Sequence, residues 1–166
     1  SQATTAATIL ANYDVDSLVK IFRDYGEERF AAPIARKIVA TRDANPLTTS
    51  SQLVDLVDSV IPKAHRAPGN PAKRVFQALR IEVNQEFEVL HEFMEKLPKI
   101  LNPGGRVAIL TFHSGEDRIV KKAFKEMKNS GIYDDVCRNV IRPSKEECHR
   151  NSRAKSTKMR WAIKAK

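Results

Sequence analysis

The sequence predicts an α/β fold in which an all-helical segment precedes a strand–turn–helix unit. Three observations support this prediction. Residues 1–62 repeat apolar side chains at helical spacing. Residues 107–112 form an unbroken apolar run that leads into a polar turn and a second helical pattern. Residues 157–164 alternate between apolar and polar side chains, which is typical of a strand with one buried face.

The first 62 residues predict four short amphipathic helices. Three of them follow a residue whose side-chain oxygen can accept a hydrogen bond from the helix N-terminus: Thr4 or Thr5, Asp14, and Ser50 or Ser51. The third helix spans about residues 27–42, and Pro33 predicts either a start near this proline or a kink. The helices have enough apolar surface to pack together. Because no reactive side-chain cluster is evident, we interpret them as a packing or docking unit.

Residues 63–71, KAHRAPGNP, form a basic linker. Asn70 as N-cap and Pro71 at the first helical position then predict one long helix that ends near Leu97. One edge of this helix carries polar side chains beside the apolar stripe: Gln77, Arg80 and Asn84. This edge predicts a polar wall that meets a ligand, although a solvated helix flank explains the spacing equally well.

Residues 102–127 hold the central strand–turn–helix. The run from Val107 to Phe112 lacks alternation, which predicts a strand covered on both faces, as in a parallel sheet. In open parallel sheets ligands bind beyond the carboxyl ends of the strands. The turn at this end contributes three candidate site residues: His113, Glu116 and Arg118.

Capping is the alternative explanation of this turn. Ser114 and Asp117 lie three residues apart and can form a capping box at the start of the following helix. Capping does not account for His113. A Ser-His-Asp hydrolase is disfavoured because neighbouring side chains on an extended backbone diverge.

The charge of the chain is distributed unevenly. Residues 1–62 contain 6 Lys and Arg against 8 Asp and Glu, whereas residues 63–166 contain 23 against 12, a net charge of +11. The basic part includes a predicted terminal hairpin with strands at 136–141 and 157–164. Such asymmetry predicts a polyanionic partner, nucleic acid first, with a solubilising surface as the alternative.

The two cysteines exclude a disulfide framework. Cys137 and Cys148 lack CxxC spacing, and together with His149 they give only a weak metal signal, so we predict no metal site. The sequence shows no signal-peptide pattern and no apolar run long enough to span a membrane. We therefore expect a cytoplasmic protein without a membrane partner.

Several stretches resemble the MraW-type methyltransferases of bacteria. They are NPAKRVFQALRIEVNQE (70–86), NPGGRVAILTFHSGEDRIVKKAFKE (102–126) and NSRAKSTKMR (151–160), and DYGEERFAAPIARKIV (24–39) is similar to the family's inserted helical domain. The resemblance implies a class I, Rossmann-like fold. It also implies transfer of a methyl group from S-adenosylmethionine to the N4 amine of a cytosine in 16S ribosomal RNA. Asn70, Gly115 and Ser152 depart from the residues usual in the family, which are His, Leu and Pro.

The resemblance covers the C-terminal part of the family. The family's donor site lies in its N-terminal half, and neither its Gly-rich turn nor its acidic ribose ligand occurs here, so the resemblance assigns no cofactor residue to this chain. It implies an inserted helical domain at 1–62, a linker at 63–71 and the C-terminal part of the methyltransferase domain at 72–166. The fragment alone is expected to be inactive.

The expected partner is small-subunit ribosomal RNA, free or in the assembled subunit. We expect the RNA backbone to contact basic residues of the C-terminal segment: Arg153, Lys155, Lys158 and Arg160. The pocket wall is expected to combine His113, Glu116 and Arg118 with Gln77, Arg80 and Asn84. A non-catalytic RNA-binding or protein-docking module is the alternative function. An open edge on strand 107–112 predicts self-association of the fragment.

Overall fold

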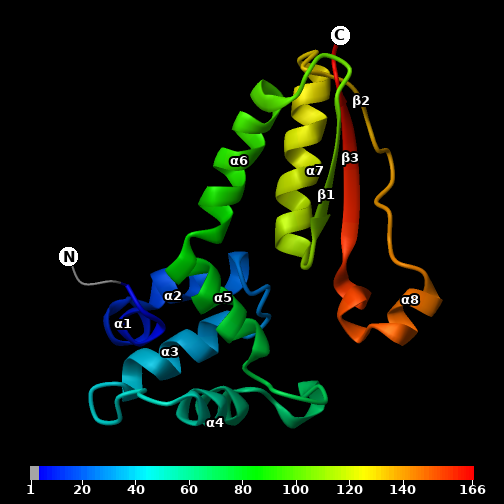
Figure 1. The fold of residues 1–166 in the computed structure, drawn as a ribbon. Coiled ribbons are helices and arrows are strands. Elements are labelled where there is room, and N and C mark those ends of the chain that lie inside the picture. The colour runs from blue at the N-terminus through cyan, green and yellow to red at the C-terminus, as the bar shows by residue number, and fades with distance from the viewer. Residues whose placement is uncertain (1–3) are drawn as a thin grey trace. The chain divides into compact units, whose positions relative to one another are not determined.

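The computed structural model describes residues 4–166, which form two compact units. The first unit ends at Gln85 and is all helical. The second comprises Glu86–Lys166 and combines helices with a three-stranded sheet (Figure 1). The structure therefore confirms a mixed helix and sheet composition, while the Rossmann-like arrangement stays a prediction.

The first unit consists of five α-helices and a short 3₁₀ helix, η1 (Lys63–His65). The α-helices are α1 (Ala6–Asn12), α2 (Val15–Asp24), α3 (Ala31–Thr41), α4 (Ser50–Val60) and α5 (Lys73–Asn84). Thr5 caps α1 and Asp14 caps α2, as predicted. The cap of α4 is Thr49, one residue before the predicted position. Pro33 lies in the first turn of α3, where a missing N–H costs no helical hydrogen bond, so no kink is needed.

The predicted long helix from Asn70 to Leu97 is wrong, because the chain forms two helices here. Gln85 adopts the left-handed conformation at φ = 52°, which a continuous right-handed helix cannot contain, and α6 (Glu86–Ile100) follows it. The helix start also differs, since α5 begins at Lys73. Asn70 instead accepts a hydrogen bond from the backbone N–H of Ala72 (2.8 Å) and orders the turn before the helix.

The core of the first unit explains where the units divide. Val75, Ala78 and Leu79 of α5 are buried together with Leu18 and Phe22 of α2. The division into compact units therefore falls between Gln85 and Glu86, and the expected domain boundary at 63–71 stays a prediction. Helical spacing predicted the buried faces, but it gave no information on which helices would pack against α5.

The second unit is built around the sheet order β1–β3–β2. Besides α6, its elements are β1 (Arg106–Thr111), α7 (Ser114–Asn129), β2 (Tyr133–Val136), α8 (Lys145–Arg150), the 3₁₀ helix η2 (Ser152–Ser156) and β3 (Lys158–Lys164). Both strand pairs are antiparallel, and β1 runs from Arg106 opposite Ile163 to Thr111 opposite Lys158. The predicted strand at 136–141 lies earlier, at β2, and Ile141 retains only an isolated bridge to Met159.

The two faces of this sheet are unequal. Val120 and Phe124 of α7 pack with Met94 and Leu97 of α6 and with Ala162 of β3 on one face. Along β1 every second residue is exposed, so the prediction that both faces of this strand are covered is wrong. The physical reason is that the helices of this unit pack on one face. Figure 1 shows α7 running alongside β1 and β3.

Candidate nucleic-acid interface

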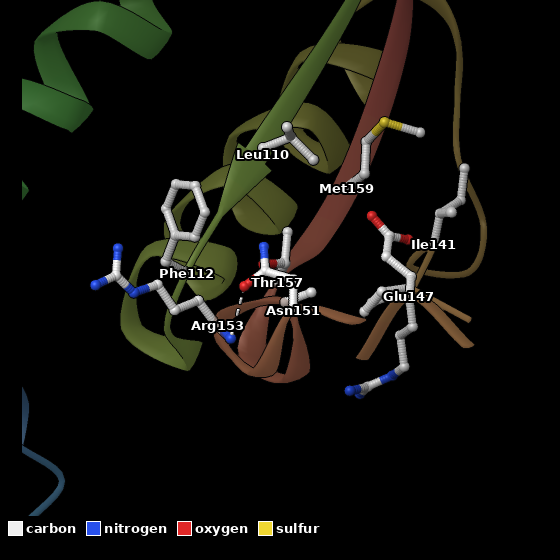
Figure 2. A pocket seen from close by; sticks show the side chains of 11 residues that line it. Leu110, Phe112, Ile141, Glu147, Asn151, Arg153, Thr157 and Met159 are labelled. Carbon is white, nitrogen blue, oxygen red and sulfur yellow. Dashed lines mark hydrogen bonds between the residues drawn. The ribbon is translucent and has the colours of Figure 1, made fainter. Parts of the chain in front are cut away.

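A pocket of about 390 Å³ lies at the carboxyl end of β1. Its floor is apolar and contains Leu110, Phe112 and Met159, and Figure 2 shows these side chains on the open side of β1 and β3. The rim carries polar and charged side chains from the connection between β2 and β3: Arg142, Glu147, Asn151, Arg153 and Thr157. An apolar floor with a few polar groups at the rim is the usual composition of a ligand pocket.

The rim is held by local capping interactions. Ser144 caps α8 by accepting a hydrogen bond from the backbone N–H of Glu147 (3.0 Å). Asn151 caps η2, because its side-chain oxygen accepts from the backbone N–H of Arg153 at 3.1 Å (dashed line in Figure 2). The β-bridge between Ile141 and Met159 holds the start of the β2–β3 connection beside β3. The short polar residues of this loop thus set the positions of its longer side chains.

The pocket suits one unstacked nucleobase. Phe112 is 60% exposed and offers a ring face, and stacking on aromatic side chains is a common way to hold single-stranded bases. Arg153 and Asn151 supply hydrogen-bond donors at the rim, and Glu147 supplies a carboxylate acceptor. The sequence predicted Arg153 as a phosphate contact, and the structure places it at this rim, whereas Phe112, Asn151 and Glu147 were not predicted as site residues. The large aromatic residue that ends the apolar run was the available signal.

The four predicted phosphate contacts do not share one environment. Arg153 and Lys155 are exposed on η2, and Lys158 is half-buried at the start of β3. Arg160 is only 7% exposed, and its Nε and Nη2 donate to the two carboxylate oxygens of Asp117 at 2.7 and 3.0 Å. It lies on the sheet face covered by α7, away from the rim.

Asp117 is therefore an ion-pair partner of Arg160, and the N-cap of α7 is His113 rather than the predicted Ser114. Burial raises the pKa of this carboxyl, but the hydrogen bonds and charge of Arg160 outweigh it, so the pKa lies below its ordinary value. The same hydrogen bonds hold the pKa of Arg160 above its ordinary value. The pair ties the first turn of α7 to the middle of β3.

His113, not Ser114, is the N-cap of α7. Its Nδ1 accepts from the backbone N–H of Glu116 (3.4 Å), so the neutral ring carries its proton on Nε2, which lies 3.4 Å from Glu116 Oε1. The ring also stacks on Phe87 with centroids 5.7 Å apart. Glu116 Oε1 accepts in addition from the backbone N–H of Phe112 (3.1 Å). The structure thus brings His113 and Glu116 together, and capping explains His113 after all.

The other predicted wall residues are placed within their own units. Gln77 donates from Nε2 to the backbone oxygen of Tyr25 (2.8 Å), which ties α5 to the end of α2. Arg80 and Asn84 are exposed on α5, and Arg118 is exposed on α7. A shared wall formed by Gln77, Arg80 and Asn84 with the turn at His113 stays a prediction.

The turn after β1 does not fit a methyl donor. A Cβ added to Gly115 would lie 2.6 Å from Cζ of Phe87, so this glycine makes room for an aromatic ring of the same unit. In dinucleotide-binding turns one glycine lets the backbone approach the phosphates, and the ring of Phe87 occupies the side of Gly115 from which such an approach would come. Within the described part of the chain, no group of three or more His, Cys, Asp or Glu side chains could hold a metal ion. Residues 4–166 also contain no helix with the length and apolar character needed to cross a membrane.

Comparison with known proteins gives the family. Residues 1–165 match the MraW methylase family. Ribosomal RNA small subunit methyltransferase H 1 of Lachnoclostridium phytofermentans is 49% identical over 167 residues, which cover 97% of this chain and 46% of that protein. The protein of the same name from Agathobacter rectalis is 46% identical over 97% of this chain and 48% of its own length. The chain spans about half the length of these curated relatives. It belongs to the MraW methylase family.

Proposed function

We propose that this chain forms the RNA-binding part of an S-adenosylmethionine-dependent methyltransferase that modifies the N4 amine of a cytosine in 16S ribosomal RNA. The observation that carries the proposal is the pocket at the end of β1, where an exposed aromatic ring lies below a polar rim. The names of the relatives support ribosomal RNA of the small subunit as the substrate. An enzyme with this substrate would work in the cytoplasm.

The chemistry explains why such a pocket is useful. The lone pair of the cytosine N4 amine is delocalised into the ring, so the amine is a poor nucleophile. Catalysis then depends on holding the amine in line with the methyl donor and on a group that accepts its proton. A base in structured RNA must first leave its stack. In our proposal Phe112 stacks on the extruded cytosine, and the carboxylate of Glu147 accepts a hydrogen bond from the N4 amine.

The basic segment around the pocket would position the RNA backbone. Arg153 lies at the rim, and Lys155 and Lys158 follow it closely in the chain. Cationic side chains of this kind contact phosphates without reading sequence, and they fix the register of the nucleic acid. Arg160 is left out of this set, because it pairs with Asp117 on the sheet face covered by α7 and is not part of the lining of this pocket.

The methyl donor would be held mainly by parts of the relatives that this chain does not span. Because the turn at Gly115 is filled by Phe87, we expect residues 1–166 alone to bind S-adenosylmethionine weakly or not at all, and to be inactive alone. Isothermal titration calorimetry checks this expectation. Micromolar affinity of the chain alone would reveal a donor site that the structure does not indicate.

We also propose that the isolated chain self-associates through β1. This strand lies at the edge of the sheet, with β3 on one side only. Unpaired backbone groups on an edge recruit another strand, and the exposed side chains of Leu110 and Phe112 add apolar surface beside that edge. The occupant we propose is a second copy of the chain.

The proposed function is tested by adding the length that the relatives have and that this chain does not span. The chain is joined to the part of the Lachnoclostridium phytofermentans relative that it does not match, and the product is incubated with unmodified small ribosomal subunits and S-adenosylmethionine. Mass spectrometry of the nucleosides should detect N4-methylcytidine. Phe112→Ala and Glu147→Gln should each lower the yield at least about tenfold, as expected for loss of positioning.

The matched control is Phe93→Ala, since Phe93 is an exposed aromatic residue of α6 that is not part of the pocket lining. This variant should retain full yield. Methylation of a position other than cytosine N4 would contradict the proposed reaction. Equal yields from the Phe112→Ala and Phe93→Ala proteins would show that the pocket takes no part in methylation.

A further inference from the structure

A second, smaller pocket lies on the sheet unit where α7, the end of β2 and β3 meet. It has a volume of about 190 Å³. Four of its seven lining residues are cationic, and none is acidic: Lys121, Lys125, Arg138 and Arg160, with Phe124, Val136 and Cys137 completing the wall. Pockets for drug-sized molecules usually measure about 300–1,000 Å³, so this volume favours a small group.

The cations reach the pocket from three separate elements. Lys121 and Lys125 are four residues apart on α7 and therefore lie on the same side of that helix. Arg138 follows β2, and Arg160 belongs to β3. The buried Phe124 and the half-buried Val136 form an apolar wall, which lowers the local dielectric and strengthens the field of the nearby charges.

The buried guanidinium of Arg160 is held in place. Asp117 accepts hydrogen bonds from two of the five N–H groups of Arg160 and neutralises its charge. The charges of Lys121 and Lys158 also lower the pKa of Asp117. Other acidic residues near α7 pair with different lysines, as in Lys122–Glu126 and Lys128–Asp135. The pocket thus keeps an excess of positive charge around a fixed arginine.

We propose that this pocket binds one phosphate group of the RNA backbone, which adds a contact on the sheet face opposite the pocket at the end of β1. A phosphate carries the charge and the several acceptor oxygens that a fixed guanidinium and flexible ammonium groups recognise. The inference rests on the proposed function for the identity of the phosphate, since a free phosphate ion has the same chemistry. The experiment separates these two sources.

Cys137 serves as a reporter inside the pocket, and Cys148, which shares a separate hollow with Lys155, reports ligand bound at the 153–158 segment. Both thiols are free and partly exposed. Alkylation by iodoacetamide is followed at each cysteine by peptide mass spectrometry, without ligand, with inorganic phosphate and with a single-stranded RNA oligonucleotide. We expect Cys137 to be alkylated at least about fivefold more slowly when the pocket is filled, and this protection should not depend on the protection of Cys148.

The variants show whether the pocket causes the protection. Lys125→Gln with Arg138→Gln changes two exposed side chains, so the fold should persist. The control Lys122→Gln changes a lysine of the same helix that points to Glu126. The double variant should lose the protection of Cys137 and bind RNA about tenfold more weakly than the control, as expected for charged hydrogen bonds to one phosphate.

Protection by inorganic phosphate as well as RNA would support a pocket that accepts any phosphate. Protection by RNA alone, lost in the double variant, would support a polymer contact. If neither ligand protects Cys137, or if the double variant and Lys122→Gln behave alike, the proposal is overturned. Methylation by the joined protein does not depend on this outcome, so failure here leaves the proposed function standing.

Discussion

The two units of the chain differ in how completely they bury their apolar side chains. The helical unit has a core of sixteen buried apolar residues, whereas the core of the sheet unit has six. All of the large apolar side chains recorded as exposed among residues 4–166 lie in the sheet unit: Val89, Phe93, Ile100, Leu110, Phe112, Ile132 and Ile141. A closed core needs no partner, while Leu110 and Phe112, which are neighbours on the open face of the sheet, mark a surface that meets something else.

The largest expected difference is in stability and compares two phenylalanines. Phe22→Ala removes a fully buried ring from the helical core and should cost about 3–5 kcal/mol of unfolding free energy. Phe112→Ala removes an exposed ring from the sheet unit and should change the unfolding free energy by about 0.5 kcal/mol or less. Urea denaturation of both variants measures the contrast. Similar losses would show that Phe112 is buried in solution.

The next effect concerns the ion pair that joins α7 to β3. Asp117→Asn leaves the guanidinium of Arg160 buried without its charge partner and should cost about 3 kcal/mol. Asp135→Asn is the control, because Asp135 forms an exposed pair with Lys128 at 3.4 Å and should contribute about 1 kcal/mol or less. Equal losses of unfolding free energy in the two variants would show that the buried Asp117–Arg160 pair contributes no more than an exposed pair.

The pH dependence of the same pair has a definite sign. The pKa of Asp117 in the folded protein lies below its ordinary value of 3.8, so the unfolded chain binds the proton more readily. Its contribution is fully present above that value, and it is lost as the pH falls through 3.8 toward the lower pKa of the folded protein. The difference in unfolding free energy between wild type and Asp117→Asn should become smaller as the pH falls from 6 to 3. Denaturation curves that stay parallel would contradict the assignment.

The smallest expected effect concerns RNA binding. The slope of log affinity against log salt concentration should become shallower by about two when Arg153, Lys155 and Lys158 are replaced with Gln. Each phosphate contact on a single strand contributes about 0.7 to the slope. Replacing Lys20 and Lys37 of the helical unit gives the control, which should leave the slope within error. A larger change of the slope in the Lys20 and Lys37 variant would show that the helical unit contacts the phosphates.

Local signals in the sequence predicted much of the helical unit. Side-chain oxygens at Thr5 and Asp14 capped the helices as expected, because capping depends on residues only three positions apart. The break at Gln85 was missed, since the residue carries no strong signal for a positive φ and the apolar stripe continues across it. Periodicity shows which side chains are buried, but it does not show against which neighbour.

The sheet unit was harder to predict, because its contacts join distant parts of the chain. The strands β1 and β3 were expected, yet the pairing of Asp117 with Arg160 links residues 43 positions apart. Charge alone grouped Arg160 with Arg153, Lys155 and Lys158, whereas the structure pairs it with Asp117 on the sheet face covered by α7. The pocket at the end of β1 was missed in part for the same reason, since Phe112 and Asn151 line one pocket only when β3 pairs with β1.

Self-association tests the central contrast between the two units most directly. Sedimentation equilibrium of the chain at several concentrations should show a mass that rises with concentration, because the edge of β1 and the open face of the sheet can pair with a second copy. Leu110→Lys with Phe112→Lys should abolish the rise and leave a monomer. Phe93→Lys, on α6, should leave the association unchanged. A wild-type monomer at every concentration, with a cooperative melt, would contradict the account.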